Sequence, residues 1–285
     1  MKKKEYVLFS LISIVYVVTV TASILFLIMA VNNRNNNTAN TIRISYNENI
    51  AELPPQSDII ESEIHLEPFH TEITEPQQDE HVVSVPDALD KVLTTFGYSS
   101  ETLNDLGCMQ LITVESSGTE ASINFYTFDN EEWCENEALS CSGFVGYSGV
   151  SNEKREGDGS TPAGLFSVGD AFFINEEPKT GLDTFEITED TYWVDDPDSI
   201  FYNMRIEGTV NQDWNSAEHM IDYSDVYEYG FVINYNIDGE YNAGSAIFFH
   251  ICNHPTFGCV GTDREFVLGY LSELNAEMNP HIIII

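Results

Sequence analysis

The hydrophobic pattern begins with an apolar run at residues 6–31 that contains no charged side chain. A run of this length can cross a bilayer with some tilt. Lys2, Lys3 and Lys4 precede it, and positive charge before a span predicts that the amino end stays in the cytoplasm. A cleaved signal peptide is the alternative, but the run is longer than a usual signal core and no clear cleavage site follows it. We therefore expect residues 1–31 to form a cytoplasmic tip and a single-pass anchor in the cell membrane, with the remaining chain extracytoplasmic.

The pattern then changes to polar sequence without periodicity over residues 32–85. Prolines recur there, as at Pro54 and Pro68, and residues 48–80 contain acidic side chains but no lysine or arginine. Segments that are poor in apolar residues and rich in like charge do not bury enough surface to fold. We interpret this region as a disordered acidic spacer.

Helical and strand periodicities appear after the spacer. Apolar positions between Pro86 and Gly97 recur at helical spacing, and the two residues suit a helix start and stop. A later helix is predicted after Thr262, where residues 262–265 match a capping box and apolar residues follow at helical spacing. We expect a folded domain over residues 86–285, with its core from about residue 108.

Strand signals dominate this domain, because short runs rich in branched and aromatic residues are separated by Gly, Asn, Asp and Pro. The clearest predicted strands are residues 109–114, 121–126, 229–235, 245–250 and 281–285. The expected fold class is therefore mostly β with a few helices.

Charge excludes one class of partner. The chain has 47 acidic and 11 basic residues, a formal net charge of -36. Such a surface repels phosphate backbones, so we expect no nucleic-acid partner. The acidity itself is explained most simply by a solvated surface.

Five cysteines limit the redox possibilities. An odd number in an extracytoplasmic domain suggests two bridges and one free thiol, or reduced thiols throughout. Cys134 could close a small loop with Cys141, and a bridge between Cys108 and Cys252 would leave Cys259 free. Other pairings remain open.

The sequence around residues 244–259 contains a candidate reactive pair. An apolar strand ends at His250, and a short loop then brings back Cys259 after Gly258. A cysteine acts as a nucleophile in its thiolate form, which an adjacent imidazole or a helix amino terminus can favour. Buried cysteines are often inert, however, and a histidine on an apolar strand is often a core residue. By itself the pair is slightly more typical of a core than of a catalyst.

A second segment at residues 154–166 changes this balance. Its glycines and Pro162 form a tight polar turn that leads into an apolar run. Taken alone, the segment indicates nothing more than an elaborate β-turn.

Together the two segments resemble the L,D-transpeptidase catalytic domain of bacterial cell-wall enzymes, the YkuD family. The family stretch Arg-x-Gly-Asp-x-x-Thr-Pro-x-Gly is matched here by Arg155, Gly157, Asp158, Thr161, Pro162 and Gly164. The family's strand-end histidine and its later [Ser/Thr]-x-Gly-Cys are matched by His250, Thr256, Gly258 and Cys259. Further matches, spread from about residue 108 to the C-terminus, are Trp193, Tyr202, Asn203, Glu218, His219, Tyr235, Asn236, Gly244 and Ser245.

Three features depart from the family pattern. Phe257 stands where a histidine commonly precedes the Gly-Cys pair, and Gly261 stands where an arginine often follows. The separation between His250 and Cys259 is also shorter than usual. These departures indicate a divergent branch and leave the substrate details open.

The resemblance implies a β-sandwich or barrel domain that forms peptidoglycan cross-links, with roles in cell-wall biogenesis and cell shape. Cys259 would attack a tetrapeptide stem at its L,D bond, release D-alanine and form a thioester, while His250 takes and returns the proton. The N–H groups of Gly258 and Cys259 would stabilise the oxyanion. An amine of a second stem completes the cross-link, whereas water would make the enzyme an L,D-carboxypeptidase. The chemistry needs no cofactor.

Substrate contacts are expected from four residues. Thr256 and Ser245 follow from the resemblance. Arg155 and Arg264 lie close to the two motifs in a strongly acidic domain, so they could bind stem carboxylates. Local ion pairs with neighbouring acidic residues, at positions 153, 156, 263 and 265, explain these two arginines equally well.

Other histidines offer alternatives for the base, and the sequence is compatible with other functions. His254 or His219 could serve as base or orienting group, but a strand end holds His250 more rigidly. His250 and His254 have the spacing of a helical zinc pair on a segment that is not helical, so we expect no metal. An inactive wall-binding module and a cysteine peptidase of different specificity remain alternatives.

Overall fold

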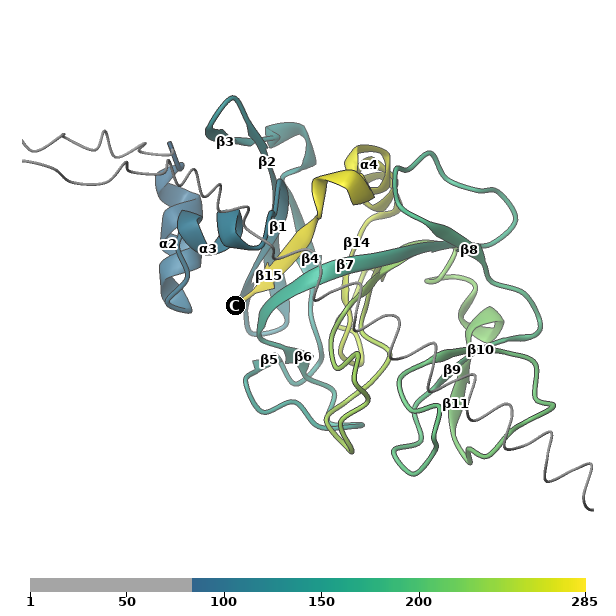
Figure 1. The fold of residues 1–285 in the computed structure, drawn as a ribbon. Helices are drawn as coiled ribbons and strands as arrows, with labels where there is room; N and C mark the ends of the chain where they lie inside the picture. The colour runs from purple at the N-terminus through teal and green to yellow at the C-terminus, as the bar shows by residue number, and fades with distance from the viewer. Residues whose placement is uncertain (1–83) are drawn as a thin grey trace, which may run out of the picture. The chain divides into compact units, whose positions relative to one another are not determined.

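The computed structural model describes residues 84–285 (Figure 1). The expected anchor at residues 1–31, and all but the end of the expected spacer at residues 32–85, lie outside the described residues. Within residues 84–285, no helix is both long and apolar enough to cross a membrane. The described chain is mostly β with few helices, as the sequence predicts.

Short helices flank the strands. The described α-helices are α2 (Asp87–Thr95), α3 (Ser100–Asp105) and α4 (Arg264–Glu273). Single 3-10 turns lie at η1 (Glu137–Leu139), η2 (Met220–Tyr223) and η3 (Ala276–Met278). Helix α2 begins after Pro86, and Gly97 follows it with a φ of 72°. The predicted start and stop of this helix are therefore confirmed.

The main sheet has ten strands and closes on itself. In neighbour order its strands are β1 (Gln110–Ser117), β15 (His281–Ile284), β7 (Gly164–Phe173), β12 (Tyr229–Ile233), β13 (Phe248–Ile251), β14 (Val260–Thr262), β4 (Cys141–Phe144), β2 (Glu120–Asp129) and β3 (Glu132–Glu135), with β8 (Thr184–Glu186) on β7. Because β1 also pairs with β2, the sheet is barrel-like and its central strands have no free edge.

Two smaller sheets complete the described fold. One contains β9 (Thr191–Val194) between β10 (Arg205–Glu207) and β11 (Ala217–His219), and the other pairs β5 (Val150–Ser151) with β6 (Thr161–Pro162). Figure 1 shows the three-stranded sheet at one end of the domain, away from α2 and α3. The short strands of this sheet carry no clear alternation, and the sequence did not predict them.

The largest core cluster lies between the closed sheet and α4. Alternate residues of the strands point inward, so Ile112, Phe231 and Ile282 are fully buried together with Tyr270 of α4. Burying a side chain of this size contributes about 1.5–3 kcal/mol. A second cluster seats α2 and α3 against β1, and a third joins Trp193 of β9 to β13.

The predicted capping box at residues 262–265 is wrong. Thr262 is the last residue of β14, and its hydroxyl donates to Ser142 O at 2.7 Å. Helix α4 begins one residue later, after Asp263, whose side chain makes no capping bond. Pairing of β14 with β13 keeps Thr262 extended and takes its hydroxyl into the sheet, so the residue cannot cap the helix. A capping box does occur at Ser99 and Thr102, at the start of α3.

Candidate active site

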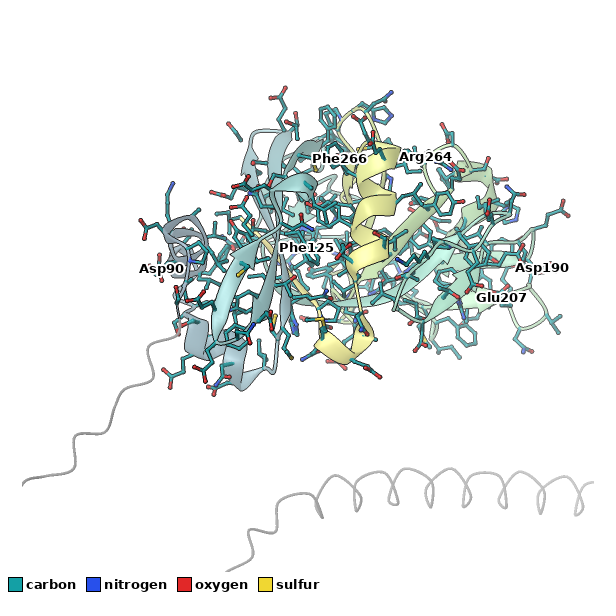
Figure 2. All side chains as sticks on the ribbon, turned by 90° about the horizontal axis from the view of Figure 1, so that it is seen from above. Asp90, Phe125, Asp190, Glu207, Arg264 and Phe266 are labelled. Carbon is teal, nitrogen blue, oxygen red and sulfur yellow. The ribbon has the colours of Figure 1, made fainter. Side chains whose placement is uncertain are left out.

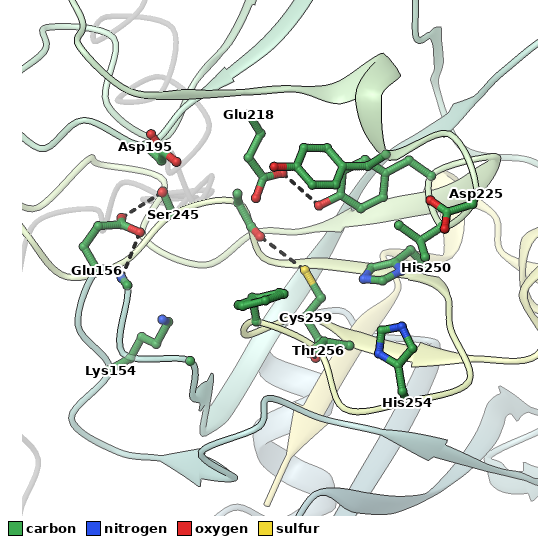
Figure 3. Close-up of a pocket in the computed structure, with 17 residues that line it drawn as sticks. Lys154, Glu156, Asp195, Glu218, Asp225, Ser245, His250, His254, Thr256 and Cys259 are labelled. Carbon is green, nitrogen blue, oxygen red and sulfur yellow. Dashed lines mark hydrogen bonds between the residues drawn. The ribbon is translucent and has the colours of Figure 1, made fainter.

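A cavity of about 540 Å³ contains both residues of the candidate reactive pair (Figure 3). Strands β13 and β14 are parallel neighbours, with Phe249 opposite Val260. His250 belongs to β13, and Cys259 directly precedes β14. The sheet therefore holds the imidazole and the thiol at the wall of one cavity.

Cys259 is held as a thiol. Its Sγ donates to Ala246 O at 3.3 Å and accepts from Phe248 N–H at 3.3 Å. Burial raises the pKa of Cys259 far above its ordinary value, the Glu218 carboxylate raises it further, and the Phe248 hydrogen bond opposes both. The expected help from a helix terminus is absent, because β14 separates Cys259 from the start of α4.

His250 is neutral and has a defined tautomer. Its Nδ1 lies 2.8 Å from Ile251 O, and because a carbonyl only accepts, Nδ1 carries the proton. Burial lowers the pKa of His250 to about 4, although the bond to Ile251 opposes this shift. The Nε2 atom is consequently the nitrogen that can accept a proton.

The loop before Cys259 is a tight turn that requires glycine. Gly258 has a φ of 147°, and a Cβ at this position would lie 3.1 Å from Ser160 O. Thr256 closes the turn, because its Oγ1 donates to Cys259 O at 2.6 Å and accepts from Gly258 N–H at 3.2 Å. The Gly258 N–H group is expected to stabilise the oxyanion. In the structure it donates to Thr256 Oγ1, so this hydrogen bond must break before the group can donate to an oxyanion.

The polar turn at residues 154–166 packs directly against this loop. Thr161 Oγ1 donates to Cys259 O at 3.2 Å and accepts from Gly146 N–H at 2.8 Å. Asp158 accepts hydrogen bonds from Lys154 Nζ at 2.7 Å and Arg155 N–H at 2.7 Å. Burial disfavours the Asp158 carboxylate, but these bonds outweigh it and hold its pKa at about 2. The motif thus positions the cysteine loop.

The two predicted substrate-binding arginines lie outside the cavity. Arg264 begins α4, where its guanidinium makes two 2.8 Å bonds to Glu228 (Figure 2). Arg155 is exposed, and its guanidinium donates to Lys154 O at 3.2 Å. Lys154, 4% exposed, lines the cavity instead. Arg264 is therefore paired away from the cavity, but with Glu228, which is remote in sequence, and not with Asp263 or Glu265 as the alternative expected.

Ser245 and Thr256 both line the cavity and are both buried. Ser245 Oγ donates to Glu156 Oε2 at 2.8 Å, and Tyr202 OH donates to the same oxygen at 2.5 Å. Tyr202 OH also accepts from Gly244 N–H at 2.9 Å. Three of the matched positions, Ser245, Tyr202 and Gly244, thus belong to one hydrogen-bonded network.

Asn203 explains several other matched positions. Its Oδ1 accepts from Trp193 Nε1 at 2.9 Å and from Ala246 N–H at 3.1 Å, and its Nδ2 donates to Tyr235 O and Asn236 O at 2.9 Å. Ala246 has a left-handed φ of 52°, so the strand predicted at residues 245–250 does not include its first residues, and β13 begins only at Phe248. Asn203 therefore fixes the carbonyl that receives the Cys259 thiol.

The opposite wall carries acidic groups whose place the sequence did not predict. Glu218 of β11 and Asp195 line the cavity with Tyr227, whose OH donates to Glu218 Oε2 at 2.8 Å (Figure 3). Burial raises the pKa of Glu218 to about 7, the Tyr227 bond opposes the rise, and Asp195 and Glu156 add to it. Glu218 is one of the positions that match the family pattern, but its strand is too short for the direction of its side chain to be predicted.

The other histidines are poorly placed to be the base. His219 Nδ1 lies 3.0 Å from Asp222 Oδ2, and its Nε2 lies 2.7 Å from Glu189 O, so both ring nitrogens are engaged. His254 lines the cavity but is exposed. No group of three or more His, Cys, Asp or Glu residues within 84–285 is arranged to hold a metal ion.

All five cysteines are free thiols in the structure. The possible bridges between Cys134 and Cys141 and between Cys108 and Cys252 are not formed. Burial raises the pKa of Cys108 to about 12 and that of Cys252 to about 11, while hydrogen bonds from the chain oppose each shift. Cys134 is exposed.

Comparison with known proteins gives little further guidance. No protein-family model matches this chain, and no curated protein matches it. Among solved structures, the chain is similar to the helical cell shape determining protein Pgp2 from Campylobacter jejuni, with a TM-score of 0.32 and 10% identity over 62% of this chain and 47% of that chain. The chain thus spans about half the length of that protein. A similarity of this extent establishes neither a family nor an activity.

Proposed function

We propose that this chain is a cysteine-dependent L,D-transpeptidase of the YkuD type that cross-links peptidoglycan stem peptides. One observation carries the proposal: Cys259 and His250 line the same cavity, and the Arg155–Gly164 motif residue Thr161 bonds the Cys259 carbonyl. Two segments that resemble the family by sequence are thus in direct contact around the candidate nucleophile. Anchoring in the cell membrane, with the domain outside, belongs to the same proposal.

The mechanism starts from two neutral groups. As the stem carbonyl approaches, His250 Nε2 takes the Cys259 proton, and the sulfur attacks to form the tetrahedral intermediate. The same proton then passes to the leaving amine of D-alanine, and the thioester remains. Because burial disfavours a resting thiolate–imidazolium pair, deprotonation is expected to accompany attack rather than precede it.

The test uses a disaccharide-tetrapeptide and mass spectrometry. We expect the peptide that contains Cys259 to increase in mass by the donor minus the released D-alanine. Cys259→Ala removes the adduct, whereas Cys134→Ala, at the exposed thiol, leaves it. Ordinary L-peptides should give none, which separates this activity from a cysteine peptidase of other specificity.

One observation favours a second candidate. Cys259 is only 7% exposed and has a raised pKa, as an inert core cysteine would. An inactive cell-wall-binding module on this scaffold would bind stem peptides without forming the adduct. Stem binding without a Cys259 adduct would establish this alternative, and a hydrolysed tripeptide as sole product would indicate an L,D-carboxypeptidase.

A further inference from the structure

The charged groups that line the cavity of the candidate active site are mainly acidic, and the proposed donor stem peptide by itself does not explain this negative charge. Glu156, Asp195, Glu218 and Asp225 line it, and Lys154 is a cation at its wall. Lys154 Nζ is already paired with Asp158 Oδ1 at 2.7 Å. A cavity with this excess of carboxyl groups favours a ligand that brings positive charge.

The carboxyl groups are not equally satisfied. Glu156 Oε2 accepts from two hydroxyl groups, those of Tyr202 and Ser245. Asp195 Oδ1 is fully buried and, within residues 84–285, has no hydrogen-bond partner. Leaving a buried acceptor unpaired costs about 1–3 kcal/mol, and more for a charged group. Asp195 therefore retains an unpaired acceptor, which a ligand donor can reach once the carboxyl group rotates to expose it.

Glu218 lies beside this acceptor and faces the nucleophile. The charge of Asp195 raises the pKa of Glu218, and the charge of Glu218 raises the pKa of Cys259. Figure 3 shows Glu218 across the cavity from Cys259, and Tyr227, which donates to Glu218, lines the same cavity. Tyr227 also stands edge-on to His250, with ring centroids 5.2 Å apart. Glu218 thus borders the place where the thioester would form, and Asp195 lines the same cavity.

We propose that Asp195 and Glu218 form the subsite for the acyl acceptor, where they bind its primary ammonium group and Glu218 removes one proton before attack. This inference rests on the proposed function and names the residues that select the amine over water. An ammonium group carries three donors, which suits one unpaired carboxylate oxygen and a second carboxylate with a free lone pair. An ammonium cannot attack, so its deprotonation is a required step.

The proton balance of the second half-reaction is as follows. The bound ammonium gives one proton to the Glu218 carboxylate, and the neutral amine attacks the thioester carbonyl. Once the C–N bond has formed, His250 takes a second proton from the attacking nitrogen. As the C–S bond breaks, His250 gives that proton to the Cys259 sulfur. The amide, the Cys259 thiol and neutral His250 result, and Glu218 releases its proton to solvent.

The experiment separates acylation from aminolysis in the full chain. Glu218→Gln keeps an oxygen for the Tyr227 hydroxyl but cannot take a proton, and Asp195→Asn removes the unpaired charge. Each variant is acylated with a tetrapeptide donor, and a diamino-acid stem is added as acceptor. The ratio of cross-linked to hydrolysed product is measured by mass spectrometry. Glu207→Gln, on exposed β10 of the same small sheet, is the matched control.

We expect the product ratio to fall at least about tenfold in Glu218→Gln, and the acceptor KM to rise in Asp195→Asn. Hydroxylamine, which is largely uncharged at neutral pH, should resolve the thioester at similar rates in all variants. An unchanged product ratio in Glu218→Gln overturns this inference, whereas formation of the thioester in the same experiment still supports the proposed function. A parallel loss with hydroxylamine also overturns it, since that result marks a structural role. Absence of a thioester in the unaltered chain overturns both proposals.

Discussion

Cys259 and His250 are both held in their neutral forms by burial, and this sets the chemistry expected of each residue. The thiol pKa is raised and the imidazole pKa is lowered to about 4, so transfer of a proton between them is unfavourable in the free protein. A bound stem peptide would change this balance, since the proton transfer is then coupled to bond formation. Reactivity toward small alkylating agents is therefore a poor guide to reactivity toward substrate.

The first residue-scale prediction concerns alkylation of Cys259. Iodoacetamide should modify it slowly at neutral pH and progressively faster as pH rises, because a raised pKa moves the thiolate form to alkaline pH. Rates are read by peptide mass mapping, with exposed Cys134 as the internal reference. A plateau of the Cys259 rate below neutral pH would contradict the pKa direction.

The second residue-scale prediction concerns Glu218 and stability. Its pKa is raised to about 7 in the folded chain, so the folded state binds this proton more tightly than the unfolded state. The contribution of neutral Glu218 is present below its ordinary pKa and is lost as pH rises through about 7. Glu218→Gln should therefore gain stability over the unaltered chain at about pH 8 but not at about pH 5, in urea unfolding. An equal difference at both pH values would show that Glu218 does not titrate as stated.

At the scale of elements, three separate segments build the site. The parallel pair β13–β14 brings His250 and Cys259 together, the 154–166 turn supports the cysteine loop, and the small sheet brings Glu218. Asn203 links the small sheet to the loop that contains Ala246. The site therefore depends on the docking of elements as much as on its reactive residues.

Asn203→Ala tests this docking. The substitution removes acceptors for two N–H groups and donors for two carbonyls, so the free energy of unfolding should fall by about 1–3 kcal/mol. Thioester formation should also slow, because the Ala246 carbonyl that receives the thiol is no longer fixed. Asn104→Ala, at an exposed position of α3, is the matched control for both measurements. An unchanged free energy of unfolding in Asn203→Ala would show that these hydrogen bonds do not stabilise the docking of the elements.

Sequence patterns predicted elements better than their ends. The helix after Pro86 and the strands at β1, β2, β12 and β15 follow from local periodicity. Local sequence does not predict the conformations of Thr262 and Ala246, because strand pairing of β14 and the Asn203 contacts decide them, and neither is local. The strands of the small sheet are too short to leave a period.

At the scale of the whole molecule, residues 76–285 form a compact unit with its own core clusters. The expected anchor lies before this unit in the sequence. Domain and anchor should therefore be separable by truncation.

Fragment 76–285 should fold cooperatively and remain in the supernatant after ultracentrifugation, because it contains every core-cluster residue of the described part of the chain, residues 84–285. The full chain should sediment with membranes through residues 6–31. Circular dichroism melting and membrane fractionation check the two halves of this prediction. A full chain found in the supernatant would contradict the anchor, and a fragment without a cooperative transition would contradict the independence of the unit.

The sequence by itself determined the fold class and the acidity, because these depend on composition and local periodicity, and the motif resemblance led to the prediction that His250 and Cys259 act together. The tertiary structure alone decided the protonation of Cys259 and His250, since burial controls the free energy of their charged forms. It also decided that Lys154 lines the cavity while Arg264 pairs with Glu228, and that Asp195 and Glu218 line the same cavity as the thiol. Side-chain direction and solvent access arise from contacts between segments distant in the chain, which no local pattern encodes.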